Sequence, residues 1–184
     1  MSPALAPPKL PSFDEPLRML HAGHIRIEQR CALLAELYNH VNAHGCDERA
    51  RRTADVILRY FDDACAKHHE DEQQDLYPVL LESLPSEERD FVVRLIDHLR
   101  TQHRELERVY AALRPALDAI VAGRKADLSH GLCERLYRLY LEHIEIEETE
   151  ILPVALERLT VDAMRRLGSA MAARRNIPFT PAAA

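Results

Sequence analysis

The stretch His143-Ile144-Glu145-Ile146-Glu147 has a counterpart earlier in the chain, His68-His69-Glu70-Asp71-Glu72. In both stretches a histidine precedes a glutamate by four residues, and a proline, Pro78 or Pro153, follows the glutamate by six. The three equivalent positions are all offset by 75 residues. Residues i and i+4 of an α-helix share a face, so an imidazole nitrogen and a carboxylate oxygen can meet at one point. Two such pairs in a short chain predict a metal site.

The composition favours a single all-α domain. At 184 residues with 47% hydrophobic side chains, the chain is long enough to bury one core. Glycine is sparse, with 5 residues, and tryptophan is absent. No stretch shows the sustained alternation of valine, isoleucine and threonine that is typical of strands.

Charge, hydropathy and cysteine spacing argue against nucleic-acid and membrane partners and favour a cytoplasmic protein. The net charge of −6 comes without a basic face that would neutralise phosphates, so no nucleic-acid partner is expected. No apolar stretch approaches the roughly 20 residues of a membrane span, so no membrane partner is expected. No signal peptide precedes the cysteines and none has CxxC spacing, which favours reduced thiols in a cytoplasmic protein: Cys31, Cys46, Cys65 and Cys133.

The apolar periodicity predicts four long helices. The first opens at a capping box formed by Ser12 and Glu15 and ends at Gly45. The second covers about residues 48–83 and the third about 87–121, with Asp47 and Ser86 as caps and bends expected at Pro78 and Pro115. The fourth starts between Asp127 and Leu132 and continues to Pro153.

These helices predict an up-down-up-down four-helix bundle. Thr160 is expected to cap a short extra C-terminal helix that ends around Arg174. The expected organisation is a flexible leader over residues 1–11, the bundle over 12–160, and the short helix with a disordered tail over 161–184.

Each half of the bundle repeats one pattern, a single histidine followed by the His-x-x-x-Glu pair. The single histidines are 79 residues apart, so the halves differ by four residues in length. The candidate metal ligands are therefore His24, His68, Glu72, His103, His143 and Glu147.

Helix lengths test whether these residues can meet. At about 1.5 Å per residue, the rise from His24 to the first turn nearly cancels the return to His68, and the levels of His68 and His103 also match. Between the third and fourth helices, 20 residues against 15 leave a mismatch of about 7 Å. An extended connection over residues 124–129 is expected to absorb it.

Four imidazoles and two carboxylates suit iron, manganese or zinc better than calcium or magnesium, which prefer oxygen ligands alone. Six side chains are too many for one tetrahedral zinc ion. They fit two metal ions, with the histidines as terminal ligands and Glu72 and Glu147 as bridges.

Other residues near the motifs have structural interpretations. His69 is the rival of His68, but the residue four positions after it is Gln73, a poorer ligand. His44 would add a fifth imidazole only if the chain folded back from the end of the first helix. Surface positions are expected for His21, His98 and His130. Core packing is expected for Tyr77 and Tyr140, with a place lining the metal pocket as the alternative. A solvated face is expected for acidic residues near the motifs, some of which can orient imidazoles: Glu70, Asp71, Asp75, Glu145, Glu148 and Glu150.

The chain resembles the hemerythrin family, specifically the bacterial HHE cation-binding domains, over about residues 16–160. The resemblance implies a four-helix bundle that holds two non-haem iron ions, oxo- or hydroxo-bridged, and binds O₂, NO or peroxide. It is carried by His24, the run His68 to Glu72 with Leu76-Tyr77-Pro78, His103 within Gln102-His103-Arg104-Glu105-Leu106, and the run His143 to Glu148 with Ile151-Leu152-Pro153.

Two positions depart from the oxygen carriers of this family. Those proteins carry a second histidine one turn after the histidine of the third helix, where this chain has Glu107. Their last carboxylate follows its histidine by five residues, whereas Glu147 follows His143 by four. Whether His44 or Glu107 supplies a further ligand is left open by the sequence, as is the choice of iron, manganese or zinc.

The expected function is binding of O₂, NO or peroxide at a hemerythrin-like di-iron centre, for sensing, detoxification or the handling of iron and oxygen. Two alternatives remain at this stage. One is an enzyme, a di-iron or di-manganese peroxidase or oxidase, and the other is a sensing or interaction bundle that the metal merely stabilises.

Overall fold

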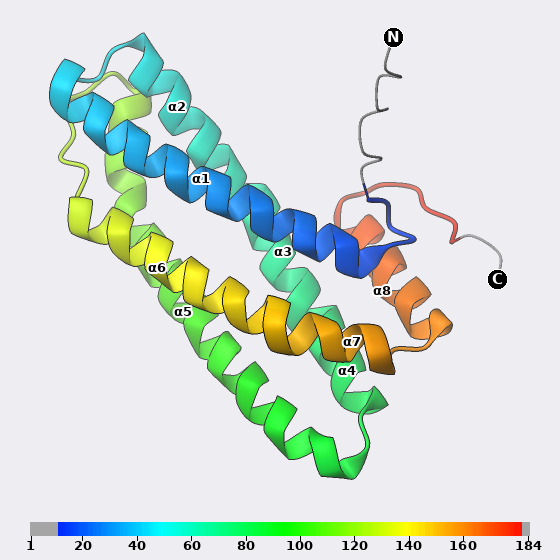
Figure 1. Ribbon diagram of the computed structural model, residues 1–184. Coiled ribbons are helices and arrows are strands. Elements are labelled where there is room, and N and C mark those ends of the chain that lie inside the picture. The colour runs from blue at the N-terminus through cyan, green and yellow to red at the C-terminus, as the bar shows by residue number, and fades with distance from the viewer. Residues whose placement is uncertain (1–10, 182–184) are drawn as a thin grey trace, which may run out of the picture.

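Four long helical arms run up and down the molecule, and one shorter helix packs at one end (Figure 1). This computed structural model describes residues 11–181, so the expected leader lies outside the described residues except for Pro11. The first and third arms are single helices, α1 (Pro16–His44) and α5 (Ser86–Val121). No strand occurs within residues 11–181, and the all-α bundle predicted from the sequence is confirmed.

The second and fourth arms alternate α-helical and π-helical turns. The second arm consists of α2 (Glu48–Arg59), η1 (Tyr60–Cys65), α3 (Ala66–Glu70), η2 (Asp71–Leu76) and α4 (Tyr77–Ser83). The fourth consists of α6 (His130–Ile146), η3 (Glu147–Ile151) and α7 (Leu152–Arg158). A short π-helical turn inside an α-helix is rare and often marks a functional site.

The two repeated prolines coincide with two of the three wide turns within residues 11–181. Pro78 and Pro153 each lie in the first turn of the α-helix that directly follows a π-helical turn, η2 or η3. A proline lacks the N–H that would bond back to the carbonyl four residues earlier, and its ring collides with that carbonyl. The irregularity expected at Pro78 thus takes the form of a wider turn just before it. In contrast, α5 continues through Pro115.

Two of the predicted helix starts are wrong. α1 begins at Pro16, because the side chain of Glu15 makes no capping bond, and Ser12 contributes only its carbonyl, which accepts the N–H of Glu15 at 2.8 Å. Ser86 is the first residue of α5 rather than its cap, since Pro85 has the extended backbone of the N-cap position.

The other predicted ends are confirmed. Side chains of Asp47 and Thr160 accept backbone N–H groups from the first turns of α2 and α8 (Val161–Arg174). Gly45 and Gly123 follow α1 and α5 with φ values of 77° and 68°, where a side chain would be strained. Residues 124–129, the connection expected to be extended, form no helix before α6 begins at His130.

The buried apolar residues form two separate clusters, and the candidate ligands lie between them in every arm. Along α1, Leu20 belongs to one cluster, His24 follows, and Ile27 belongs to the other. The same order holds in reverse along the second arm, where Cys65 and Leu76 enclose the first His-x-x-x-Glu pair. A polar layer therefore crosses the whole bundle.

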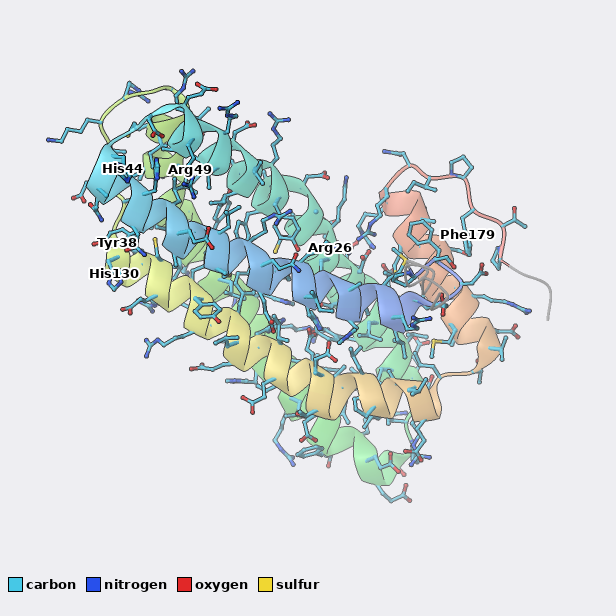
Figure 2. All side chains as sticks on the ribbon, turned by 45° about the horizontal axis from the view of Figure 1, so that its top comes forward. Arg26, Tyr38, His44, Arg49, His130 and Phe179 are labelled. Carbon is cyan, nitrogen blue, oxygen red and sulfur yellow. The ribbon has the colours of Figure 1, made fainter. Side chains whose placement is uncertain are left out.

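The C-terminal helix α8 packs against the start of the chain. A Cβ added at Gly168 of α8 would lie 1.9 Å from the carbonyl oxygen of Phe13, so only glycine permits this contact. Beyond α8, the ring of Phe179 packs edge-on against Phe13, with ring centroids 5.6 Å apart. Figure 2 shows Phe179 at the end of the molecule opposite to His44.

All four cysteines are free thiols, three of them buried. Within the described part of the chain, no helix combines the length and the apolar character needed to cross a membrane.

Candidate metal centre

The structure brings all six sequence-predicted ligands together in the polar layer. Each is at most 5% exposed, although two come from the single-helix arms α1 and α5 and four from the two π-interrupted arms. They are His24 in α1, His68 in α3, Glu72 in η2, His103 in α5, His143 in α6 and Glu147 in η3.

Glu72 lies at the middle of this cluster. Its Oε1 is 2.7 Å from Nε2 of His68 and 3.5 Å from Nε2 of His24, and its Oε2 is 3.2 Å from Nε2 of His103. Despite these short distances, neither oxygen has a hydrogen bond of acceptable geometry within the described residues, and Nε2 of His68 has none either. A buried carboxylate without hydrogen bonds is costly, so this donor set fits a bound cation.

Glu147 is held more firmly by the protein. Its Oε2 lies 3.0 Å from Nε2 of His24 and 3.5 Å from Nε2 of His143. The hydroxyl of Tyr77, which is fully buried, donates a hydrogen bond of 2.5 Å to its Oε1. Tyr77 packs in the apolar core, as expected from the sequence, and its hydroxyl also reaches the candidate centre, which was the alternative.

Potential ligand atoms form two groups that share Glu72. One group contains His24, His68, Glu72 and Glu147, and the other contains His69, Glu72 and His103, with the ligand atoms of each group within 4.8 Å of one another. His143 adjoins the second group, since its Nε2 is 3.0 Å from Nε2 of His103. Two metal positions with Glu72 between them are compatible with this arrangement.

His69 is the residue that sequence reasoning ranked too low. Its side chain is buried, and its ring stacks on that of His103 with centroids 4.2 Å apart. Gln73, one turn later on the same helix, is a poor ligand, but the neighbours of His69 come from α5 and from Glu72. The adjacent His-His pair was the available signal.

Outer contacts orient several of these imidazoles. Nδ1 of His24 is 2.5 Å from Oε1 of Glu148, and Nδ1 of His143 is 3.1 Å from Oε1 of Gln102. Such contacts fix the ring orientation and the tautomer of a metal-binding histidine. Glu148 thus has the orienting role that the sequence allowed for part of the acidic group.

Asp71 does not lie on a solvated face, as the sequence suggested. It is completely buried, and its carboxylate pairs with both Arg174 and Arg175 at the end of α8. Arg174 also contacts Asp75 at 2.6 Å and Glu70 at 3.1 Å. Ion pairs therefore connect the end of the C-terminal helix to the π-helical turn η2, which carries the neighbouring Glu72.

The remaining candidates stay outside the cluster. His44 is exposed at the far end of α1, with its ring 4.8 Å from that of His40 (Figure 2). Glu107 is exposed on α5, as is His98. The surface positions expected for His21 and His130 are confirmed.

Burial and neighbouring charges set the protonation of the donors. Burial lowers the pKa of His143 to about 3, and burial together with His103 lowers the pKa of His69 well below its usual value. Burial alone would lower the pKa of His24, but hydrogen bonds to Glu147 and Glu148 and the nearby carboxylate of Glu72 raise it well above the ordinary value. His143 and His69 are thus neutral, as metal ligation requires, whereas His24 must release a proton to bind a metal.

Burial would raise the pKa of Glu72, but the charge of His68 and the close nitrogen atoms of His103 and His24 lower it well below the usual value. The buried carboxylate is therefore ionised. Its negative charge is available to a cation.

The helical bundle and its buried histidine–carboxylate layer define a metal-binding protein of the four-helix class. The family model of the hemerythrin HHE cation-binding domain matches residues 15–166, and the chain belongs to this family. It is 30% identical over 173 residues to an uncharacterized protein of Haemophilus influenzae, which covers 94% of this chain and 97% of that relative.

Proposed function

We propose that this chain is a hemerythrin-like protein that holds two non-haem iron ions and binds O₂, NO or peroxide for sensing, detoxification or the handling of iron and oxygen. The observation that supports it best is Glu72, whose two oxygens lack hydrogen bonds while histidine nitrogens of three arms surround them. A carboxylate in that position suits a bridge between two cations.

The proposed terminal ligands are His24, His68, His103 and His143, with Glu72 and Glu147 as bridges. His69 is proposed as a fifth imidazole, in the place where the sequence had considered His44. This choice follows from the burial of His69 and its membership of the group around Glu72 and His103.

When bound, iron would supply the electrons and the open coordination position that small oxidants and diatomic gases require. The protein around it contributes three things. The two apolar clusters exclude bulk water from both sides of the layer. Tyr77 holds Glu147 by a hydrogen bond, and Gln102 accepts one from His143 if that ring carries its proton on Nδ1.

Metal analysis tests the centre directly. Protein purified from iron-supplemented cells is expected to contain about two irons per chain, one for each group of donors. Glu72→Ala should lose the bound pair, while Glu107→Ala, which removes an exposed carboxylate one turn from His103, should retain it. Two metals per chain in Glu72→Ala would refute the assignment.

The small-molecule ligand requires a second measurement. O₂, NO and hydrogen peroxide are added separately to the iron-loaded protein while its visible spectrum is followed. A stable spectral change with one of them supports binding. Multiple turnovers of peroxide would instead favour the peroxidase alternative, and an unchanged spectrum with all three would refute the proposed gas or peroxide binding.

A further inference from the structure

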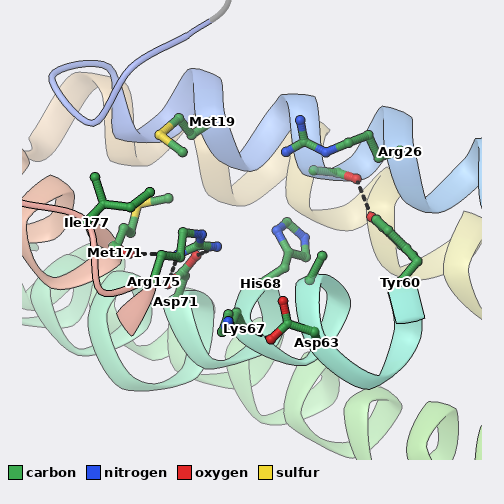
Figure 3. A pocket seen from close by; sticks show the side chains of 12 residues that line it. Met19, Arg26, Tyr60, Asp63, Lys67, His68, Asp71, Met171, Arg175 and Ile177 are labelled. Carbon is green, nitrogen blue, oxygen red and sulfur yellow. Dashed lines mark hydrogen bonds and ion pairs between the residues drawn. The ribbon is translucent and has the colours of Figure 1, made fainter. Parts of the chain in front are cut away.

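A pocket of about 400 Å³ opens beside the candidate metal centre, between α1, the second arm and the end of α8 (Figure 3). This volume lies within the range of about 300–1,000 Å³ typical of small-molecule sites. The ring of His68 lines the pocket and points toward α1. The pocket therefore reaches the candidate centre from the outside.

The two ends of the pocket differ in chemistry, as Figure 3 shows. Arg26 and Tyr60 lie at one end, and the apolar side chains of Met19, Met171 and Ile177 lie at the other. A ligand that fills the pocket would thus have one polar and one apolar end.

The positive charges at the pocket are not all compensated. Nζ of Lys67 is 2.5 Å from a carboxylate oxygen of Asp63, and Arg175 is paired with Asp71. Arg26 lines the same pocket, and no carboxylate of the described residues forms an ion pair with it. An anionic group on the ligand would supply that partner.

The second ring nitrogen of His68 is also without a partner. In the candidate centre, Nδ1 of His24 and Nδ1 of His143 each meet an oxygen acceptor, at 2.5 Å and 3.1 Å, whereas Nδ1 of His103 is enclosed by the described part of the protein without one. Nδ1 of His68 lies against Gly23, where an added Cβ would come within 2.6 Å, and within residues 11–181 it has no hydrogen bond. The residue is nevertheless only 5% exposed and its ring lines the pocket, so the acceptor for this nitrogen has to come from whatever occupies the pocket.

We propose that the pocket binds a small organic carboxylate with a short apolar chain. The carboxylate accepts the Nδ1–H of His68 and pairs with Arg26, and the chain lies between Met19, Met171 and Ile177. A metal-binding histidine usually donates its second N–H to a carboxylate or carbonyl, and this ligand supplies the acceptor that the chain lacks at His68. Only the link to the metal rests on the proposed function, since the pocket and its unpaired groups are present without it.

Isothermal titration calorimetry with octanoate tests the proposal. The protein is used as purified, and its metal content is measured on the same sample. Acetate carries the charged group without the chain, and 1-octanol carries the chain without the charge. Octanoate is expected to bind at least tenfold more tightly than either.

Three variants locate the binding. Arg26→Gln is expected to weaken octanoate binding tenfold or more, because it removes the unpaired cation. Arg18→Gln, on the same helix but outside the pocket, should leave the affinity unchanged. Ala64→Trp places a bulky ring at an exposed residue of the pocket wall and should abolish binding. An unchanged melting temperature in each variant confirms that the protein is folded.

Equal affinities for octanoate and 1-octanol, or an unchanged affinity in Arg26→Gln, would overturn the proposal. The di-iron function and the carboxylate ligand of the pocket can fail independently of each other. Specific octanoate binding by protein that takes up no metal keeps the pocket ligand and contradicts the di-iron function. Two irons per chain without octanoate binding would support the di-iron function and contradict the pocket ligand.

Discussion

The two proposed bridging carboxylates, Glu72 and Glu147, occupy equivalent places in the repeat, but the protein supports them differently. Glu72 itself has no hydrogen bond within the described residues. Its support comes through the neighbouring Asp71, which Arg174 and Arg175 at the end of α8 hold in a fully buried position. Glu147 receives a direct hydrogen bond from Tyr77. The first half of the repeat is therefore held by residues at the end of α8, outside the four arms, and the second half by a residue of another arm.

This difference shows how a duplicated pattern can specialise. The bundle alone supplies the contacts of the second half, because Tyr77 comes from the opposite arm. The first half depends on the extra helix α8, which lies beyond the repeat. The following variants test whether the ion pairs of Asp71 stabilise the protein more than the hydrogen bond from Tyr77 to Glu147.

Asp71→Asn is expected to have the largest effect. It removes the charge that faces two arginines at a fully buried position, and breaking such a pair costs about 3–5 kcal/mol of unfolding free energy. Urea denaturation measures the loss. Asp90→Asn, at an exposed position, should change stability by less than about 0.5 kcal/mol. A comparably small change in Asp71→Asn would show that α8 does not support the first half.

Tyr77→Phe should have a smaller effect. It removes one hydrogen bond to a charged group, worth about 1.5–3 kcal/mol, and leaves the aromatic packing in place. The same denaturation experiment applies, with Tyr137→Phe as a control because that ring is exposed. If Tyr77→Phe were as stable as the parent protein, the hydrogen bond from Tyr77 to Glu147 would contribute nothing to the free energy of unfolding.

Glu148→Gln should have the smallest effect on stability but a visible one on metal binding. Glu148 orients His24, and loss of such an outer contact typically weakens metal affinity about 10–100-fold. The partial exposure of Glu148 favours the lower end of that range. Competition with a chelator measures the affinity, and Glu145→Gln, on the exposed side of α6, is the control. Equal affinities in both variants would exclude the orienting role.

The grouping of the six candidate ligands was largely predictable from the sequence because its determinants are local. The i, i+4 spacing places each histidine and glutamate on one helix face, and helix lengths bring the faces to one level. The mismatch between the third and fourth arms correctly indicated a non-helical connection over residues 124–129.

The parts that sequence reasoning missed depend on contacts between distant segments. Nothing near Asp71 indicates the two arginines that bury it, since they lie more than 100 residues later. His69 was judged by its own helix, whereas its neighbours come from α5. Tyr77 follows a π-helical turn, and a count of 3.6 residues per turn does not reproduce its direction toward Glu147.

The polar layer has a consequence for how the protein unfolds. Because the two apolar clusters have no buried residue in common, each can open without disrupting the packing of the other. Once a cation is bound, its ligands from all four arms would link the two apolar clusters through the polar layer. Hydrogen exchange should then show two regions that open separately in the metal-free protein and a single cooperative unit in the loaded one.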